Sequence, residues 1–167
     1  MADKYLKNNG GNLAEVEGII VSAGAGDSGK IAALDAAGKW AVSMMPTGIA
    51  ADVATVEASE DLVAGNLVNI YDSTGAKCRK ADATTVGKEA HGFVIAIVTN
   101  GNNATIYFEG SNDYVTGLTP GIQFLSTTAG LASVTAPSAS GNIVQKVGVA
   151  TSATSLNVEF SNPITLV

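Results

Sequence analysis

The chain of 167 residues has few aromatic and few charged side chains. Aromatic residues make up 5% and charged residues 14%, against roughly 25% charged residues in ordinary soluble domains. Because 46% of the residues are hydrophobic, a core must be built mainly from Val, Ile, Leu and Ala. Charge is scarcest from Tyr114 to Val167, where only Lys146 and Glu159 carry it. Protein interfaces are depleted in charge, so this stretch predicts a surface covered by partners. A surface solvated by hydroxyl and amide groups is the alternative.

Basic residues, cysteine and long apolar runs are also scarce. The net charge is -6, and the one basic cluster (Lys77, Arg79, Lys80) has no aromatic ladder beside it, which argues against a nucleic-acid partner. A single cysteine, Cys78, excludes an internal disulfide and fits a reducing compartment. It suits a small apolar strand position, although its basic neighbours would lower its pKa. No apolar run has transmembrane length and no signal peptide is visible, so we expect no membrane partner.

What the chain does contain is a duplicated pattern. Equivalent positions are Leu62/Leu118, Gly65/Gly121 and Gly92/Gly148, each pair 56 residues apart, Gly75/Gly130, 55 apart, and Phe108/Phe160, 52 apart. The separation changes only where turns are expected. Two copies are too few for a solenoid. The pattern therefore predicts one domain made of two similar halves.

Both halves have the features of β-structure. Strand-like segments are 67–71, 92–98 and 104–109 in the first half, and 122–126, 147–150 and 156–160 in the second. Gly92–Val98 is continuously apolar, as in a strand buried on both faces, and Asn100-Gly101 is a strong hairpin dipeptide. We predict an all-β fold, a small antiparallel β-barrel or sandwich of two similar four-stranded halves. This domain spans 56–167, with repeats at 57–112 and 113–163.

Residues 1–55 have a broken pattern that predicts an extended N-terminal arm. Asn8–Gly11 and Gly24–Gly29 interrupt any regular element, and the short apolar runs at 16–21, 31–34 and 40–45 favour small strands or one short helix. An apolar side chain on such an arm needs a partner surface, or must pack back on the domain. The candidate partner contacts are Tyr5, Leu6, Ile19, Ile20, Trp40, Met44, Met45 and Pro46.

Catalytic signals are weak. Gly24–Lys30 matches part of a phosphate-binding loop, but Ile31 stands where a metal-binding hydroxyl is needed. The only histidine, His91, opens an apolar strand and is expected to be structural. Glu60-Asp61 and Asp82 have no calcium-loop spacing. We expect no catalytic residue, no metal and no cofactor.

Several segments resemble tailed-phage structural proteins. They are Ser22–Trp40 with Ser43–Gly48, Glu57–Gly110 with its Glu60–Gly65 and Arg79–Asp82 patterns, and Leu118–Leu125 through Val144–Val149. These segments are similar to capsid decoration (cement) and head-fibre proteins. The resemblance implies a non-enzymatic virion protein on the outer capsid surface, assembled in the bacterial cytoplasm. It further implies that the protein binds the major capsid protein, stabilises the shell and forms homotrimers. A head-fibre or tail-associated host-binding module is the alternative, and a nucleotide-binding protein using Gly24–Lys30 is a remote one.

Overall fold

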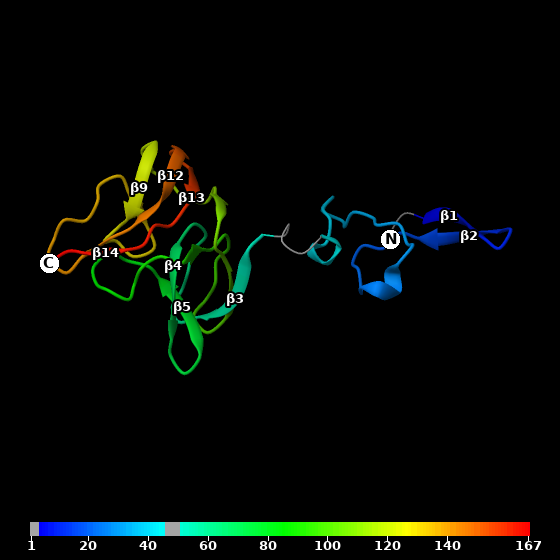
Figure 1. Cartoon of the computed structure of the whole chain (residues 1–167), viewed down its shortest axis with the longest axis horizontal. Coiled ribbons are helices and arrows are strands. Elements are labelled where there is room, and N and C mark those ends of the chain that lie inside the picture. The colour runs from blue at the N-terminus through cyan, green and yellow to red at the C-terminus, as the bar shows by residue number, and fades with distance from the viewer. Residues whose placement is uncertain (1–3, 46–50) are drawn as a thin grey trace. The chain divides into compact units, whose positions relative to one another are not determined.

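The computed structural model describes residues 4–45 and 51–167, and the chain divides into two units, Met1–Ala50 and Ala51–Val167. The second unit begins before the boundary expected after residue 55, because strand β3 (Val53–Ala58) pairs with β7 (Asn103–Tyr107) from Val53 onward. Nearly all regular structure is strand (Figure 1). The helices of the described residues are two 3-10 helices, η1 (Ala25–Asp27) and η2 (Val42–Met44). The all-β prediction is confirmed.

The first unit contains a β-hairpin where an extended arm was predicted. Strands β1 (Lys4–Asn9) and β2 (Asn12–Glu17) pair antiparallel along their whole length. Gly10 and Gly11 have φ angles of 61° and 93°. A two-residue turn of this kind requires positive φ at both positions, which glycine adopts without steric cost. The prediction that Asn8–Gly11 interrupts any element is therefore wrong, because these glycines form the hairpin turn.

The first half of the second unit is a closed five-stranded barrel, in the order β3-β5-β4-β6-β7. Its other strands are β4 (Leu67–Asp72), β5 (Ala76–Lys80) and β6 (Gly92–Phe93). Neighbouring strands are antiparallel except β3 and β5, which run parallel and close the barrel.

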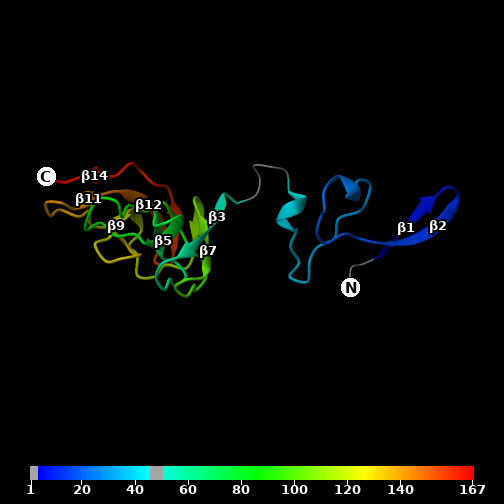
Figure 2. The same ribbon diagram turned by 90° about the horizontal axis from the view of Figure 1, so that it is seen from below.

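The second half is an open five-stranded antiparallel sheet beside the barrel (Figures 1 and 2). Its order is β10-β9-β12-β13-β8. The strands are β8 (Gly110–Asn112), β9 (Gly121–Leu125), β10 (Ala132–Ser133), β12 (Lys146–Ser152) and β13 (Ser155–Val158). A short pair, β11 (Ile143–Val144) with β14 (Ile164–Thr165), holds the C-terminal segment.

The two halves have the same strand order. From one edge to the other, the strands of the open sheet lie in the order β10, β9, β12, β13, β8. If the barrel is opened between β5 and β3, its strands lie in the order β5, β4, β6, β7, β3. Each strand of the barrel thus has a counterpart at the same place in the open sheet. The barrel and the open sheet each have five strands and not the four predicted for each half, because a further strand, β3 or β8, precedes the repeat motif. Strand β8 pairs with β13 of the second half. The second repeat thus begins at Gly110 and not at residue 113.

The core consists of two apolar clusters. One is formed by residues of the barrel half alone: Val56, Ala58, Leu62, Val68, Cys78, Val94, Ala104 and Ile106. The other joins both halves: Leu67, Ala81, Ala83, Ala90 and Phe93 with Leu125, Ile143, Val147, Leu156 and Val158. Successive side chains of a strand point to opposite faces. Leu67 and Phe93 accordingly lie in the shared cluster, while Val68 and Val94 lie in the barrel cluster. The wall formed by β4 and β6 is therefore buried on both sides.

A buried glutamine adds polar bonds between the halves. Gln145 accepts a hydrogen bond from the Ala90 backbone N–H at 2.8 Å and donates one to the Ala90 carbonyl at 2.9 Å. Its amide nitrogen also lies 3.2 Å from the Ser161 carbonyl. Gln145 is 2% exposed, so loss of its amide would leave buried backbone groups unpaired.

The apolar run Gly92–Val98 was predicted as one continuous strand, and this is wrong. Strand β6 ends at Phe93, and Ile97 is 79% exposed. The chain instead pairs twice with residues 62–66, through Val94 with Gly65 and Asn66 and through Val98 with Leu62. Between these two contacts the chain bends, and Ala96 and Ile97 are exposed. The predicted turn at Asn100-Gly101 is confirmed: Gly101 has a φ of 84° and the turn leads into β7.

The first prediction concerns the close approach of the two halves at Gly65. A Cβ atom there would lie 2.3 Å from the Tyr114 carbonyl oxygen, and its φ is 91°. The equivalent glycine, Gly121, has a φ of 122° but open space around its Cβ position. Gly65→Ala should lower the free energy of unfolding by about 3 kcal/mol, from strain and overlap together, and Gly121→Ala by about 1 kcal/mol, from strain alone. Urea denaturation measures both, and equal losses would contradict the close contact.

Candidate interaction surfaces

The first unit has no buried side chain among residues 4–41 and 43–45. Every buried side chain of the described residues belongs to the second unit. The first unit is held instead by backbone hydrogen bonds and by short side-chain caps, such as Asp35 accepting from the Ala37 and Lys39 N–H groups. Tyr5, Ile19 and Ile20 are only half-buried. Ordering a segment that buries little apolar surface costs conformational entropy with little return. The described part of this unit therefore lacks a buried apolar core.

Alternation in the hairpin separates two of the candidate contacts. Tyr5 lies opposite Val16, and Leu6 lies opposite Glu15 on the other face. Leu6 is 70% exposed, and Leu13, diagonal to it on the same face, is 74% exposed. The sequence analysis missed Leu13. Leu13 could have been selected from the sequence by the register of the hairpin. A turn at Gly10-Gly11 places residues 6 and 13 on the same face.

A groove of about 550 Å³ brings two candidates together. Tyr5 and Ile20 line it, and the Tyr5 hydroxyl accepts a hydrogen bond from the Ile31 N–H at 3.4 Å. Ile19 does not line the groove. It forms an isolated parallel bridge with Ala32 beside it. The other lining residues, which sequence reasoning did not select, are Lys4, Gly18, Ile31, Ala32, Ala33, Leu34, Asp35 and Ala36.

The remaining candidates lie near the end of this unit. Trp40 is 51% exposed and follows the turn at Asp35–Gly38, and Met45 is 43% exposed. Met44 is half-buried at the end of η2. Pro46 lies outside the described residues. Exposed Trp and Met side chains supply contact area at protein interfaces, so Trp40 and Met45 remain candidate contacts.

The Gly24–Lys30 loop differs from a phosphate-binding loop in geometry. The carboxylate of Asp27 accepts from the Ala23 N–H at 2.6 Å and from the Lys30 ammonium at 2.7 Å. These bonds, the one from Lys30 foremost, lower the pKa of Asp27 below its usual value. The loop is followed by the extended bridge at Ala32 and not by a helix. Its lysine and one backbone amide are thus bound by the loop's own carboxylate.

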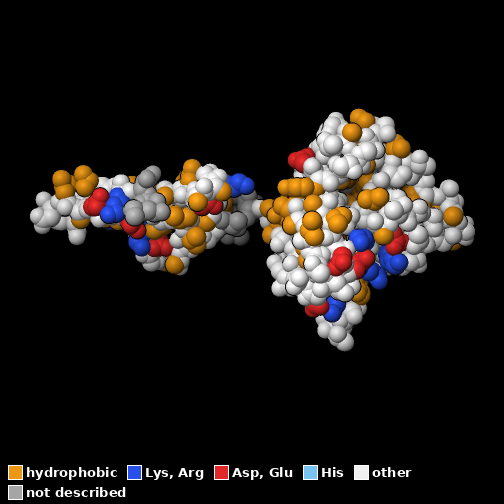
Figure 3. Space-filling view, turned by 180° about the vertical axis from the view of Figure 1, so that it is seen from behind, with side chains coloured by type: hydrophobic (Ala, Val, Ile, Leu, Met, Phe, Trp, Pro, Cys, Tyr) orange, Lys and Arg blue, Asp and Glu red, His pale blue; other side chains and the backbone are white. Residues whose placement is uncertain are grey.

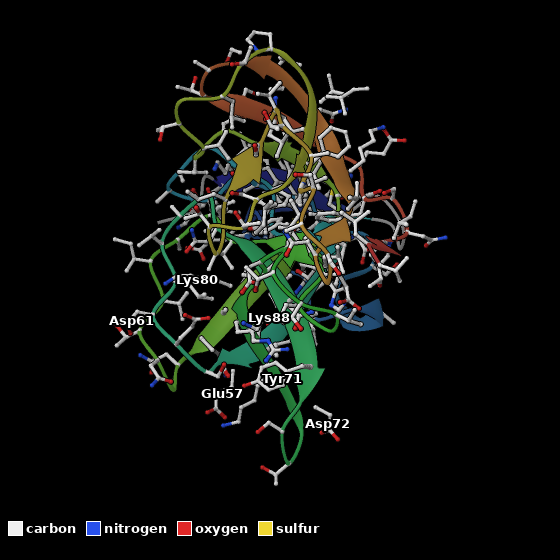
Figure 4. The ribbon with its side chains drawn as sticks, turned by 90° about the vertical axis from the view of Figure 1, so that its left-hand side faces the viewer. Glu57, Asp61, Tyr71, Asp72, Lys80 and Lys88 are labelled. Atoms are coloured by element: carbon white, nitrogen blue, oxygen red, sulfur yellow. The ribbon has the colours of Figure 1, made fainter. Side chains whose placement is uncertain are left out.

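A second surface, on the barrel, carries a cluster of positive and negative side chains (Figure 3). Lys77 pairs with Glu57 at 2.9 Å, Lys80 with Glu60 at 3.6 Å and Lys88 with Asp82 at 3.0 Å. Figure 4 shows Glu57, Tyr71, Lys80 and Lys88 around the strands drawn in green. The Arg79 guanidinium lies 4.2 Å from the centre of the Tyr71 ring.

These pairs neutralise the basic cluster that the sequence contains at residues 77–80. Arg79 also donates to Asn69 at 3.1 Å and to the Gly87 carbonyl at 2.7 Å. Burial raises the pKa of Asp82, but hydrogen bonds from Thr84 and Lys88 outweigh burial and hold that pKa below its usual value. Exposed ion pairs contribute at most about 1 kcal/mol each. The surface is a network of paired charges and not a free positive face.

Of the residues with reactive side chains, His91 makes a hydrogen bond to the backbone and Cys78 is buried in the core. His91 accepts a hydrogen bond at Nδ1 from the Ile70 N–H at 3.0 Å. Cys78 is fully buried in the barrel cluster. Burial, and secondly the nearby Glu60 carboxylate, raises the pKa of Cys78. Lys77 and Arg79 therefore do not lower this pKa as their position beside Cys78 suggested, because neighbouring side chains on a strand point to opposite faces.

Comparisons of the chain with protein-family models, with curated proteins and with solved structures find no match. Within residues 4–45 and 51–167, no helix is long and apolar enough to cross a membrane. In the same residues, no group of three or more His, Cys, Asp or Glu side chains is placed to share a metal ion.

The second prediction concerns the Cys78 thiol. Its burial and raised pKa should make the native protein react with the thiol reagent DTNB at pH 8 only through transient opening. Reaction should be orders of magnitude slower than in urea-unfolded protein. Cys78→Ala combined with Ser73→Cys, which places the thiol in the exposed turn after β4, is the control and should react at once. Equal rates for native and unfolded wild-type protein would contradict the buried position.

Proposed function

We propose that the chain is a non-enzymatic virion structural protein, a decoration protein on the outer surface of a tailed-phage head. Its partner is the major capsid protein. The observation that carries this proposal is a difference between the two units. Within the described residues, every buried side chain lies in the second unit, and the first unit exposes Leu6, Leu13 and Trp40. Such a segment is suited to docking on a large partner surface. The resemblance of the sequence to decoration proteins supplies the identity of that partner.

Binding of this kind stabilises a shell by mass action. A protein that binds the assembled lattice and not the free subunits favours the assembled state. The first unit would supply the contacts, and the second would form the body exposed on the head. No step of this role requires a catalytic residue, a metal or a cofactor.

The third prediction is that deleting residues 1–50 separates folding from attachment. The deletion stops short of β3, which begins at Val53. Residues 51–167 should keep a cooperative thermal transition, because they contain every buried side chain of the described chain. Phage particles made with this variant should lack the protein by cryo-electron microscopy and mass spectrometry, whereas particles made with the full chain carry it. Unchanged occupancy by a folded variant would refute attachment through the first unit.

We further propose that the protein forms a symmetric oligomer through the weakly charged second half, with a trimer matching the three-fold positions of an icosahedral shell. The observation in support is a set of exposed apolar side chains on this half, Ile122, Leu131 and Val134. A closed cyclic assembly covers such side chains without open-ended growth. Ala150 is buried at 2% exposure, so it is not part of this surface.

The fourth prediction follows from Val134, which is 52% exposed. Val134→Glu should shift the sedimentation coefficient from that of a trimer to that of a monomer, because a charge at an interface core must be desolvated. Its thermal midpoint at low concentration should remain unchanged. Val86→Glu is the matched control, since Val86 is 62% exposed on the first half. A wild-type chain that sediments as a monomer at tens of micromolar would defeat a preformed oligomer.

A further inference from the structure

A shallow pocket of about 370 Å³ lies where the two halves of the second unit meet. Residues of the first half contribute Glu89, Ala90, His91 and Phe108, and residues of the second half contribute Gln145, Phe160, Ser161, Asn162 and Pro163. The pocket is separate from the groove of the first unit and from the charged surface of the barrel.

The pocket is built from equivalent positions of the two repeats. Glu89 and Gln145 lie 56 residues apart, the separation that also relates Gly92 to Gly148. Phe108 and Phe160 are the aromatic pair that ends the two repeats. The repeat therefore places the Glu89 carboxylate, the Gln145 amide and the two phenylalanine rings around the same pocket.

The two equivalent polar residues differ in how their hydrogen-bonding groups are satisfied. Gln145 bonds to Ala90 through both its oxygen and its nitrogen, and again to Ser161. Glu89 has a buried carboxylate oxygen, Oε2, with no hydrogen-bond partner among the described residues. Burying part of a carboxylate without a partner is unfavourable. Glu89 lines the pocket, so a positive group bound there would offset the negative charge of its carboxylate.

The other residues that line the pocket indicate which kind of positive group it could bind. Glu89 is the one acidic side chain that lines the pocket, and neither Lys nor Arg lines it in the described chain. A single carboxylate is too few ligands for a calcium or magnesium ion. Phe108 and Phe160, both half-buried, also line it, and the faces of aromatic rings attract organic cations. One carboxylate with two aromatic rings fits an ammonium or guanidinium group on an alkyl chain.

We propose that this pocket binds an organic cation, an alkylammonium or alkylguanidinium group of the kind that ends a lysine or arginine side chain. Glu89 supplies the charge, and Phe108 with Phe160 supplies the aromatic walls. The two Gln145–Ala90 hydrogen bonds join a lining residue of one half to a lining residue of the other. This site does not depend on the virion role proposed above, since its chemistry concerns only the second unit.

The fifth prediction tests the site by NMR titration of the ¹⁵N-labelled full chain with n-butylammonium chloride and with n-butylguanidinium chloride. Saturable shifts are expected at the backbone amides of Ala90, His91 and Ser161. Sodium chloride at the same ionic strength, magnesium chloride and the neutral analogue n-butanol should not reproduce them. Absence of saturable shifts with both cations, or an equal response to n-butanol, would overturn the proposal.

Substitution of Glu89 tests whether its carboxylate binds the cation. Glu89→Gln removes the charge and places at 89 the residue that the repeat already has at 145. It should weaken n-butylammonium binding about tenfold, the loss of one charge pair near a protein surface. Glu17→Gln, in the first unit, makes the same charge change and should bind as the wild type does. Thermal denaturation without ligand checks the fold of each variant. Equal affinity in folded Glu89→Gln protein would remove Glu89 from the site and overturn the proposal.

Discussion

The two-sided burial of the wall formed by β4 and β6 is the constraint on which the second unit depends. Leu67 and Phe93 contact the second half, and Val68 and Val94 fill the barrel cluster. Each large apolar side chain buried in this way contributes about 1.5–3 kcal/mol. Without the second half, the outer side of this wall would face water, and the Gln145–Ala90 bonds would be lost with it. The barrel is therefore one half of a single folding unit, although its hydrogen bonding is closed.

The two halves share strand order but differ in closure, and the difference has a local cause. Strand β3 has six residues and pairs with both β7 and β5, where Glu57 and Lys77 add an ion pair to the parallel register. Its counterpart β8 has three residues and pairs with β13. The second half therefore keeps two free edges. Both edge strands are short, which limits unwanted pairing with other chains.

The sequence predicted the parts of this fold that local chemistry decides. Paired glycines and alternating apolar residues indicated the duplicated β-structure, and Asn100-Gly101 indicated a turn. Sequence reasoning failed where a pattern has two meanings. Gly10-Gly11 was interpreted as an interruption because glycine both breaks elements and makes hairpin turns. Gly92–Val98 was interpreted as a strand because an apolar run does not reveal where the backbone bulges. The pocket at Glu89 could not be predicted from the sequence, because it forms only when residues far apart in the chain are packed together.

The equivalence of Glu89 and Gln145 has a consequence for how such a chain changes over time. In a chain with two repeats, every position has an equivalent. One of the two residues can keep a structural role while the other tolerates substitution. Gln145 retains that role, with two hydrogen bonds to Ala90 of the first half and one to Ser161 of its own half. Glu89 occupies the matching place without those bonds and is free to acquire new chemistry. A chain with an internal repeat of this kind can therefore change one of two equivalent residues while the other continues to hold its halves together.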